Sequence, residues 1–159
     1  MGVYQKKWES FIDAELDAVW DFFSRPENLN KITPPEMNFE ILNDIAGRKM
    51  YPGMIIQYRV RPLLNIPTTW VTEITEIEEK KYFVDDQRVG PYKMWHHEHH
   101  FEKRDNGVLM TDLLHYSLPA EPIGSLLMGR FISKKVDGIF EYRNQVIPKL
   151  FPSKEERGG

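Results

Sequence analysis

Hydrophobic and polar positions change period three times along the chain. Residues 4–12 alternate loosely between apolar and polar side chains, which predicts a β-strand. The next apolar residues fall at the spacing of one face of an amphipathic helix: Leu16, Val19, Trp20 and Phe23. A second short helix is expected from Ser24 to about Ile32, with Ser24 and Glu27 forming a capping box and Pro34 stopping the helix.

Short β-rich runs separated by turn residues follow, up to residue 118. The expected strands cover residues 39–42, 54–60, 69–77, 82–88, 92–103 and 108–118. The strongest hairpin signal is Asn106-Gly107, because both residue types tolerate a positive φ. Consecutive strands at this spacing predict an antiparallel meander.

A long helix is expected after Pro119. Its predicted inner face consists of Met128, Ile132, Val136, Ile139, Phe140, Arg143 and Ile147. Pro148 is expected to end this helix, and Gly129 and Gly138 within it indicate either a kink or a close approach of the backbone to the sheet. We expect residues 1–150 to form a single domain and residues 151–159 to form a polar tail.

The order of elements predicts an α+β fold. A curved antiparallel sheet of about seven strands is expected to wrap around the long C-terminal helix, with two short helices after the first strand. Such a sheet is too wide to lie flat on one helix, so it twists around the helix and leaves space beside it. The architecture therefore predicts a cavity between the sheet and the C-terminal helix.

Composition narrows the classes of function. The formal net charge is −3, from 21 Lys and Arg against 24 Asp and Glu, which disfavours nucleic-acid binding. Cysteine is absent, so disulfides, thiolate nucleophiles and Cys-ligated zinc are excluded. The sequence shows no apolar stretch typical of a signal peptide or a membrane span, and we expect a cytoplasmic protein without stable membrane insertion.

Candidate chemistry lies on alternating positions of three neighbouring strands. Because side chains alternate across a strand, Trp95, His97, His99 and Phe101 share one face, which the aromatic residues mark as inward. The polar groups expected to converge there are Asp85, Gln87, His97, His99, Asp112 and Tyr116. The apolar residues expected around them are Trp70, Phe83, Trp95, Phe101, Phe131 and Phe140. Such a mixture is typical of a small-molecule pocket.

Four interpretations of this patch remain open from the residues alone. The polar groups satisfy one another and stiffen the sheet, or they orient the polar end of a hydrophobic or aromatic ligand. As an enzyme, the chain would use His97 or His99 as general base, positioned by Asp85 or Asp112, with Tyr116 or Gln87 donating a hydrogen bond to a developing oxyanion. The reaction would be a cofactor-free cyclisation, dehydration or isomerisation. A metal site on His97 and His99, with Asp85 or Asp112, is the less favoured alternative, and we expect no metal and no cofactor.

Two further features bear on partners. Arg143 falls in the apolar stripe of the long helix, where it needs a partner, and pairing with an inward carboxylate is the favoured interpretation. The apolar loop at residues 63–67 is expected to act as a lid, a subunit contact or a membrane-touching portal. We expect a hydrophobic small-molecule ligand and a monomer or homodimer; a purely partner-binding protein would instead use the patch near Leu63 and Leu64.

The sequence resembles the SRPBCC or START-like superfamily over most of its length. The resemblance rests on residues 19–29, 32–35, 83–87, 90–92, 111–112, 116–119 and 139–143, and on Trp95-His96-His97-Glu98-His99-His100-Phe101. It is most similar to the bacterial ligand-binding branch, which is related to polyketide cyclases and dehydratases. The resemblance implies a helix-grip fold with a deep, mostly apolar cavity between the sheet and the last helix. The superfamily includes lipid carriers and aromatase/cyclases, so the resemblance does not distinguish between binding and catalysis.

Overall fold

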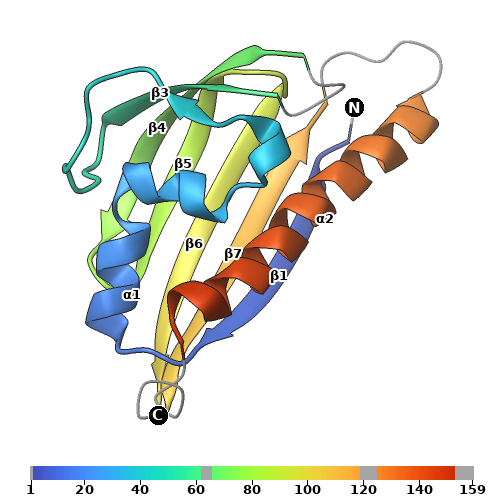
Figure 1. Cartoon of the computed structure of the whole chain (residues 1–159). Coiled ribbons are helices and arrows are strands. Elements are labelled where there is room, and N and C mark those ends of the chain that lie inside the picture. The colour runs from blue at the N-terminus through green and yellow to red at the C-terminus, as the bar shows by residue number, and fades with distance from the viewer. Residues whose placement is uncertain (1, 62–65, 119–124, 153–159) are drawn as a thin grey trace.

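One antiparallel sheet curves around a long C-terminal helix (Figure 1). The computed structural model describes residues 2–61, 66–118 and 125–152. The strands in these ranges are β1 (Tyr4–Ile12), β2 (Glu40–Ile41), β3 (Met54–Val60), β4 (Thr68–Glu78), β5 (Tyr82–Val89), β6 (Met94–Arg104) and β7 (Gly107–Ser117). The helices are α1 (Leu16–Phe23), the 3₁₀ helices η1 (Pro26–Ile32) and η2 (Pro35–Met37), and α2 (Ser125–Leu150).

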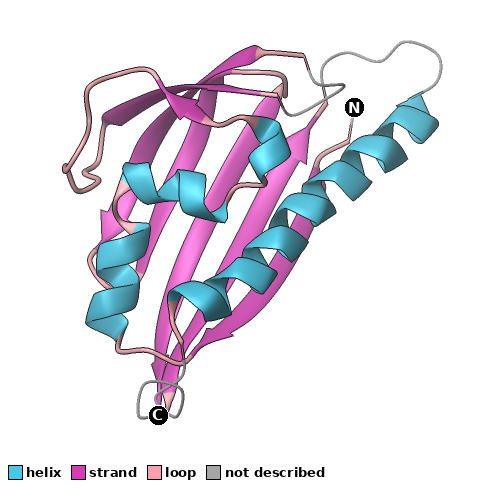
Figure 2. Ribbon diagram, viewed as in Figure 1, coloured by secondary structure: helices cyan, strands magenta, loops and turns pink. Residues whose placement is uncertain are grey.

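The sheet has the order β1-β7-β6-β5-β4-β3-β2, and every neighbouring pair is antiparallel. The meander from β3 to β7 is extended by β1, which forms one edge of the sheet. It pairs with β7 so that Tyr4 lies opposite Tyr116 and Ile12 opposite Val108. Helix α2 crosses the concave face, and α1, η1 and η2 cover the same face at its other side (Figure 2). The predicted helix-grip architecture is confirmed.

The first predicted short helix is confirmed as α1, but the second differs from its prediction. The second one is a 3₁₀ helix that begins at Pro26, with Arg25 at the N-cap and no side-chain cap. Ser24 instead ends α1, and its hydroxyl is buried without a hydrogen-bond partner among the described residues. Glu27 accepts a hydrogen bond from the backbone N–H of Gly47 at 2.6 Å. The predicted capping box was therefore wrong, because Pro26 begins a new helix before Ser24 can cap one.

Helix α2 differs from its prediction at its C-terminal end and at one of its two glycines. The helix includes Pro148 and ends at Leu150, because a proline in the last turn removes only one helical hydrogen bond. A Cβ atom on Gly129 would lie 3.3 Å from the hydroxyl of Tyr4, whereas one on Gly138 would meet nothing within 4 Å. A close approach is thus present at Gly129 alone of these two positions.

The hairpin between β6 and β7 is confirmed, but its glycine serves another purpose. Arg104 pairs with Gly107 across a turn of Asp105 and Asn106, and neither Asn106 nor Gly107 has a positive φ. A Cβ atom on Gly107 would lie 2.2 Å from the carbonyl oxygen of Ile12 on β1. Glycine is required there because β1 passes close to the hairpin.

Two apolar clusters fill the space under the helices. Tyr58, Trp70, Trp95 and Phe140 belong to the first, and Trp20, Phe23, Phe83 and Phe101 belong to the second. Every second residue of β6 points inward and is buried. His97 and His99 therefore lie between Trp95, which belongs to the first cluster, and Phe101, which belongs to the second. No helix in the described ranges is long and apolar enough to cross a membrane.

Helix α2 is fixed to the sheet by one buried ion pair and by flanking contacts. Arg143 donates a hydrogen bond to Asp112 on β7 at 2.7 Å. Arg143 is about 5% exposed and Asp112 about 2%. Phe140 stacks on Trp8 of β1 with ring centroids 3.7 Å apart. Lys6 pairs with Asp137 at 2.6 Å on the rim. The predicted pairing of Arg143 with an inward carboxylate is confirmed, and together with the contacts of Trp8 and Lys6 it places α2 over β7 and β1.

Replacing Arg143 with methionine is expected to lower the free energy of unfolding by about 3–5 kcal/mol, because Asp112 remains as a buried charge without its partner. The double variant Asp112→Asn/Arg143→Met is expected to lose less than the sum of the two single variants. Urea unfolding measures all three. Arg104→Met is the matched control. Arg104 pairs with Glu102 on the surface, and this ion pair contributes less than about 1 kcal/mol to the free energy of unfolding. Equal losses for Arg143→Met and Arg104→Met would contradict the role given to the buried pair.

Two glycine substitutions are expected to change stability in opposite directions. Gly138→Ala should raise the free energy of unfolding by about 1 kcal/mol, because alanine favours the helix and the space beside Gly138 is open. Gly107→Ala should lower it by about 1–3 kcal/mol through the clash with the backbone of Ile12. Guanidinium unfolding of both variants measures the effect, and a Gly107→Ala protein as stable as the parent would refute the close approach.

Candidate functional site

A pair of histidines occupies the centre of the concave face. His97 and His99 lie two residues apart on β6, so both point to the inside of the sheet, and each is about 4% exposed. The strand pairing places Asp85 of β5 opposite His97 and Asp112 of β7 opposite His99. The two imidazoles therefore lie between two carboxylates from the neighbouring strands.

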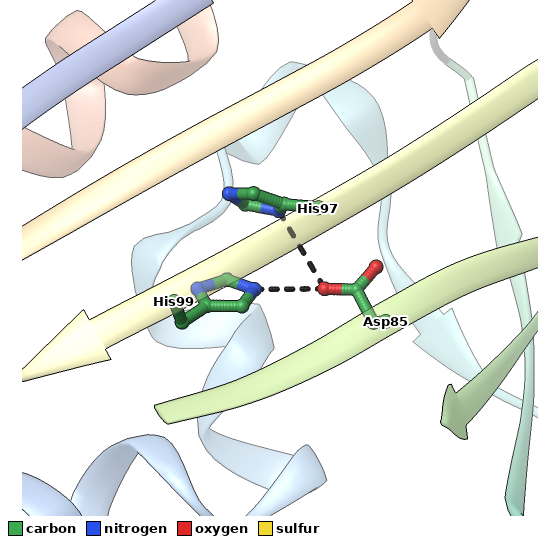
Figure 3. A group of neighbouring side chains, drawn as sticks. All are labelled: Asp85, His97 and His99. Atoms are coloured by element: carbon green, nitrogen blue, oxygen red, sulfur yellow. Dashed lines mark hydrogen bonds and ion pairs between the residues drawn. The ribbon is translucent and has the colours of Figure 1, made fainter. Parts of the chain in front are cut away.

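Asp85 faces both imidazoles from the cavity side (Figure 3). Its Oδ2 atom lies 2.7 Å from Nε2 of His99 and 3.5 Å from Nδ1 of His97. The other carboxylate oxygen is directed away from both contacts in Figure 3. The Asp85 side chain is 17% exposed, against 5% for each histidine side chain. Asp85 is therefore the more accessible member of the group.

Asp112 faces the same imidazoles from the opposite side. Its Oδ1 atom lies 2.9 Å from Nε2 of His97 and 2.7 Å from Nη1 of Arg143. Nδ1 of His99 is 3.1 Å away but is not directed well enough to make a hydrogen bond. Asp112 thus connects both histidines to Arg143, and through it to helix α2.

Aromatic rings limit the rotation of the imidazoles. Phe83 stacks on His99 with centroids 4.1 Å apart and planes 19° apart, and Phe140 meets His97 edge-on at 5.4 Å. The two imidazole centroids are 3.8 Å apart. The rings are therefore held by packing as well as by the carboxylates.

Burial and the neighbouring charges shift the pKa values of the two histidines in opposite directions. Burial lowers the pKa of His97, and the adjacent His99 lowers it further. Burial also opposes charge on His99, but contacts with Asp112 and Asp85 outweigh it, so the pKa of His99 is raised. These directions favour a neutral His97 beside a charged His99.

The carboxylates stay ionised. Burial alone would raise the pKa of Asp112, but Arg143, followed by the hydrogen bond from His97, holds it well below its usual value. Burial acts on Asp85 in the same way, and contacts with His99 and His97 lower the pKa of Asp85 on balance. Two negative charges then face Arg143 and His99, and the cluster is close to neutral, as a buried group of charges requires.

A cavity of about 120 Å³ opens beside this cluster. Its apolar wall comes from β3 to β6 and α2 and includes Ile56, Val60, Trp70, Ile74, Phe83, Trp95 and Phe140. Half-buried residues from η1, η2 and the segments beside them surround its open side: Leu29, Thr33, Met37 and Phe39. Asp85, His97, His99 and Arg143 form the charged or titratable part of the inner wall. The lining is therefore mostly apolar, with this charged cluster on its inner wall and with Arg25, Asn28 and Thr33 also among its polar residues.

The predicted site residues fall into two groups. Those lining the cavity are Trp70, Phe83, Asp85, Trp95, His97, His99 and Phe140. Those outside the lining are Gln87, Phe101, Asp112, Tyr116 and Phe131. Asp112 lies behind the histidines, and Phe101 packs in the second apolar cluster against Trp20 and Phe23.

The other three residues outside the lining each have a different role. The amide of Gln87 donates to the carbonyl oxygen of Tyr92 at 2.6 Å, which orders the β5–β6 turn. The hydroxyl of Tyr116 interacts with Ser133 on α2 rather than with the histidines. Phe131 is 41% exposed, because it lies on the outer side of α2. Strand alternation and helical spacing alone do not resolve these side-chain contacts.

Several lining residues were not singled out from the sequence. Tyr58 and Thr72, on β3 and β4, share a buried hydrogen bond of 3.0 Å, and Tyr92 packs on Trp95 with centroids 4.7 Å apart. The alternation of β3 marks Tyr58 as inward, so this residue was accessible to the same argument as His97. The residues at the open side come from 3₁₀ and irregular segments, whose side chains follow no period. Leu63, Leu64 and Asn65 of the expected apolar loop lie outside the described residues.

The comparisons with known proteins agree with this architecture. The family described as polyketide cyclase/dehydrase and lipid transport matches residues 12–140. No functionally curated protein matches the chain. Among solved structures, CV1439 from Chromobacterium violaceum is similar with a TM-score of 0.69 at 12% identity, covering 92% of this chain and 96% of that one.

Two further structures show the same fold. TTHA0849 from Thermus thermophilus has a TM-score of 0.64 at 15% identity and covers 92% of this chain and 99% of its own. The aromatase/cyclase Zhui from a Streptomyces species has a TM-score of 0.64 at 16% identity, covering 92% and 88%. Because the family match spans well over half of the sequence, the chain belongs to the polyketide cyclase/dehydrase and lipid transport family of the SRPBCC/START-like superfamily.

Proposed function

We propose that this protein binds a hydrophobic or aromatic small molecule that carries one polar group. Membership of the family supports a ligand-binding or cyclase function. The observation that carries the finer proposal is the Asp85 carboxylate in the wall of a cavity whose lining is mostly apolar. A polar group that can be hydrogen-bonded in an apolar site selects for the ligand that completes the bond.

The volume and the aromatic lining of the cavity favour a flat ring system. An apolar cavity of about 150 Å³ holds benzene, so about 120 Å³ suits one ring, with further atoms reaching the open side. Trp70 and Trp95 meet edge-on at 5.3 Å, and Tyr92 lies against both. Aromatic walls of this kind pack well against a planar ligand.

The free oxygen of Asp85 favours a hydrogen-bond donor on the ligand. Oδ2 already contacts both histidines, whereas Oδ1 makes no hydrogen bond within the described part of the chain. A phenol or enol hydroxyl at this position would donate to a carboxylate, and hydrogen bonds to charged groups are worth about 1.5–3 kcal/mol. The proposed ligand class is therefore a hydroxylated aromatic compound.

The proposal predicts that 2-naphthol binds about tenfold more tightly than naphthalene, because only 2-naphthol donates to Asp85. Asp85→Leu should remove this difference by weakening 2-naphthol alone. Asp86→Leu is the matched control, because Asp86 is the next residue of β5 and its side chain bonds His96 on the outer face. Isothermal titration calorimetry measures the affinities. Equal binding of the two compounds to the parent protein, or an equal loss in Asp86→Leu, would overturn the proposal.

A second candidate function is proton transfer on a bound carbonyl compound. His97 lines the cavity, and Asp112 fixes its Nε2, so Nδ1 is the atom oriented toward the cavity side. An oriented His–Asp arrangement of this kind is typical of a general base. His97 would take the proton from a carbon next to the carbonyl, leave an enolate, and return a proton to the same molecule.

Deuterium exchange at the α-carbon of 2-tetralone tests the second candidate. The parent protein should accelerate exchange in D₂O above the buffer rate, and His97→Ala should abolish the acceleration while 2-tetralone still binds. His96→Ala, on the outer face of the same strand, should exchange like the parent. Proton NMR follows the reaction. An exchange rate that never exceeds that of buffer would leave binding as the function.

A further inference from the structure

We infer that Asp85, His97 and His99 form a binding site for one divalent transition-metal ion, such as Zn²⁺ or Fe²⁺, on the wall of the cavity. Two imidazoles and one carboxylate with open positions are a common ligand set for these ions. The inference does not depend on the organic ligand proposed above, because it concerns the side chains alone.

The ligand atoms already lie near one another. One ligand atom from each of the three residues falls within 4.8 Å of the others. Oδ2 of Asp85 is 2.7 Å from Nε2 of His99 and 3.5 Å from Nδ1 of His97 (Figure 3). Ligands that each sit about 2.0–2.2 Å from one ion are separated by roughly 3–3.5 Å. Small side-chain rotations are therefore enough to surround an ion.

The residues behind the histidines fix which nitrogen is available. Asp112 accepts from Nε2 of His97, which leaves Nδ1 of His97 on the side of Asp85. Nδ1 of His99 lies 3.1 Å from the same Asp112 oxygen, which leaves Nε2 of His99 on the side of Asp85. Metal-binding histidines commonly use a carboxylate, as His97 uses Asp112, to orient the ring and fix its tautomer. Arg143 holds Asp112 in turn at 2.7 Å.

Charge and access also suit a cation. With both imidazoles neutral, as metal ligation requires, the two carboxylates outweigh Arg143 by one negative charge. An ion in this position would face the cavity, because all three ligands line it. Three protein ligands leave coordination positions open on that side, where an oxygen atom of a bound molecule or a water would complete the shell.

The outer face of the sheet offers competing histidines. His96 and His100 contact Asp86 and Glu98 there, and His115 lies beside His96 with ring centroids 6.2 Å apart. These side chains are at least partly exposed and would take up metal ions weakly. The chain has five histidines, so the variant His96→Gln/His100→Gln/His115→Gln retains only His97 and His99. This triple variant isolates the proposed site.

The experiment titrates Zn²⁺ alone into the metal-free triple variant by calorimetry, and Co²⁺ alone with visible absorption as a direct report of ligation. We expect one ion per chain and a Co²⁺ ligand-field band. Adding His97→Ala or Asp85→Asn to the triple variant should weaken binding at least tenfold and remove the band. Asp112→Asn should weaken it by about 10–100-fold, as loss of an orienting carboxylate does.

Two results would overturn the inference: a folded triple variant that binds no ion, or one whose binding is unchanged by His97→Ala. If the triple variant does not fold, as judged by circular dichroism, the parent protein with His97→Gln/His99→Gln replaces it. Full Zn²⁺ stoichiometry in that double variant would then place the metal on the outer histidines and overturn the inference. Binding of 2-naphthol to EDTA-treated parent protein separates a failed metal site from a failed ligand site.

Discussion

The buried ion pair between Asp112 and Arg143 is the interaction on which the arrangement of the site depends. It joins the sheet to α2 at 2.7 Å and holds Asp112 beside both histidines, where Asp112 accepts a hydrogen bond from His97. A buried ion pair adds little net stability, because the cost of removing the two charges from water offsets their attraction. Its structural effect is the position that it imposes: α2 stays over β7 and β1, and both imidazoles keep one nitrogen toward the cavity.

The same constraint explains how a fold that is mostly apolar can hold five ionisable side chains together. Asp85, His97, His99, Asp112 and Arg143 balance one another, so none is left as an uncompensated charge. On the cavity side, Oδ1 of Asp85 makes no hydrogen bond to any described residue. The proposed organic ligand and the proposed metal ion both bind at this carboxylate. A donor group of an organic molecule satisfies Asp85, and a cation replaces the contact between Asp85 and His99.

Strand alternation was sufficient to predict much of this arrangement. It placed His97, His99, Asp85 and Trp95 on one face, and helical spacing placed Arg143 toward a carboxylate, because both periods are set by the backbone. Alternation gives a face but not a contact. Tyr116 and Asp112 share that face on β7, yet only Asp112 reaches the histidines, since register and the position of α2 decide the rest. Gln87 bonds a turn, and the open side of the cavity depends on irregular segments.

The most direct test of the account is a ¹H–¹⁵N NMR spectrum of the histidine side chains, recorded while 2-naphthol is added. The ring nitrogens of His97 and His99 should shift in proportion to occupancy, because the ligand shares the Asp85 carboxylate with them. The rings of His96, His100 and His115 should not move. Saturable binding of 2-naphthol that leaves His97 and His99 unchanged would contradict the claim that this cluster is the polar end of the binding site.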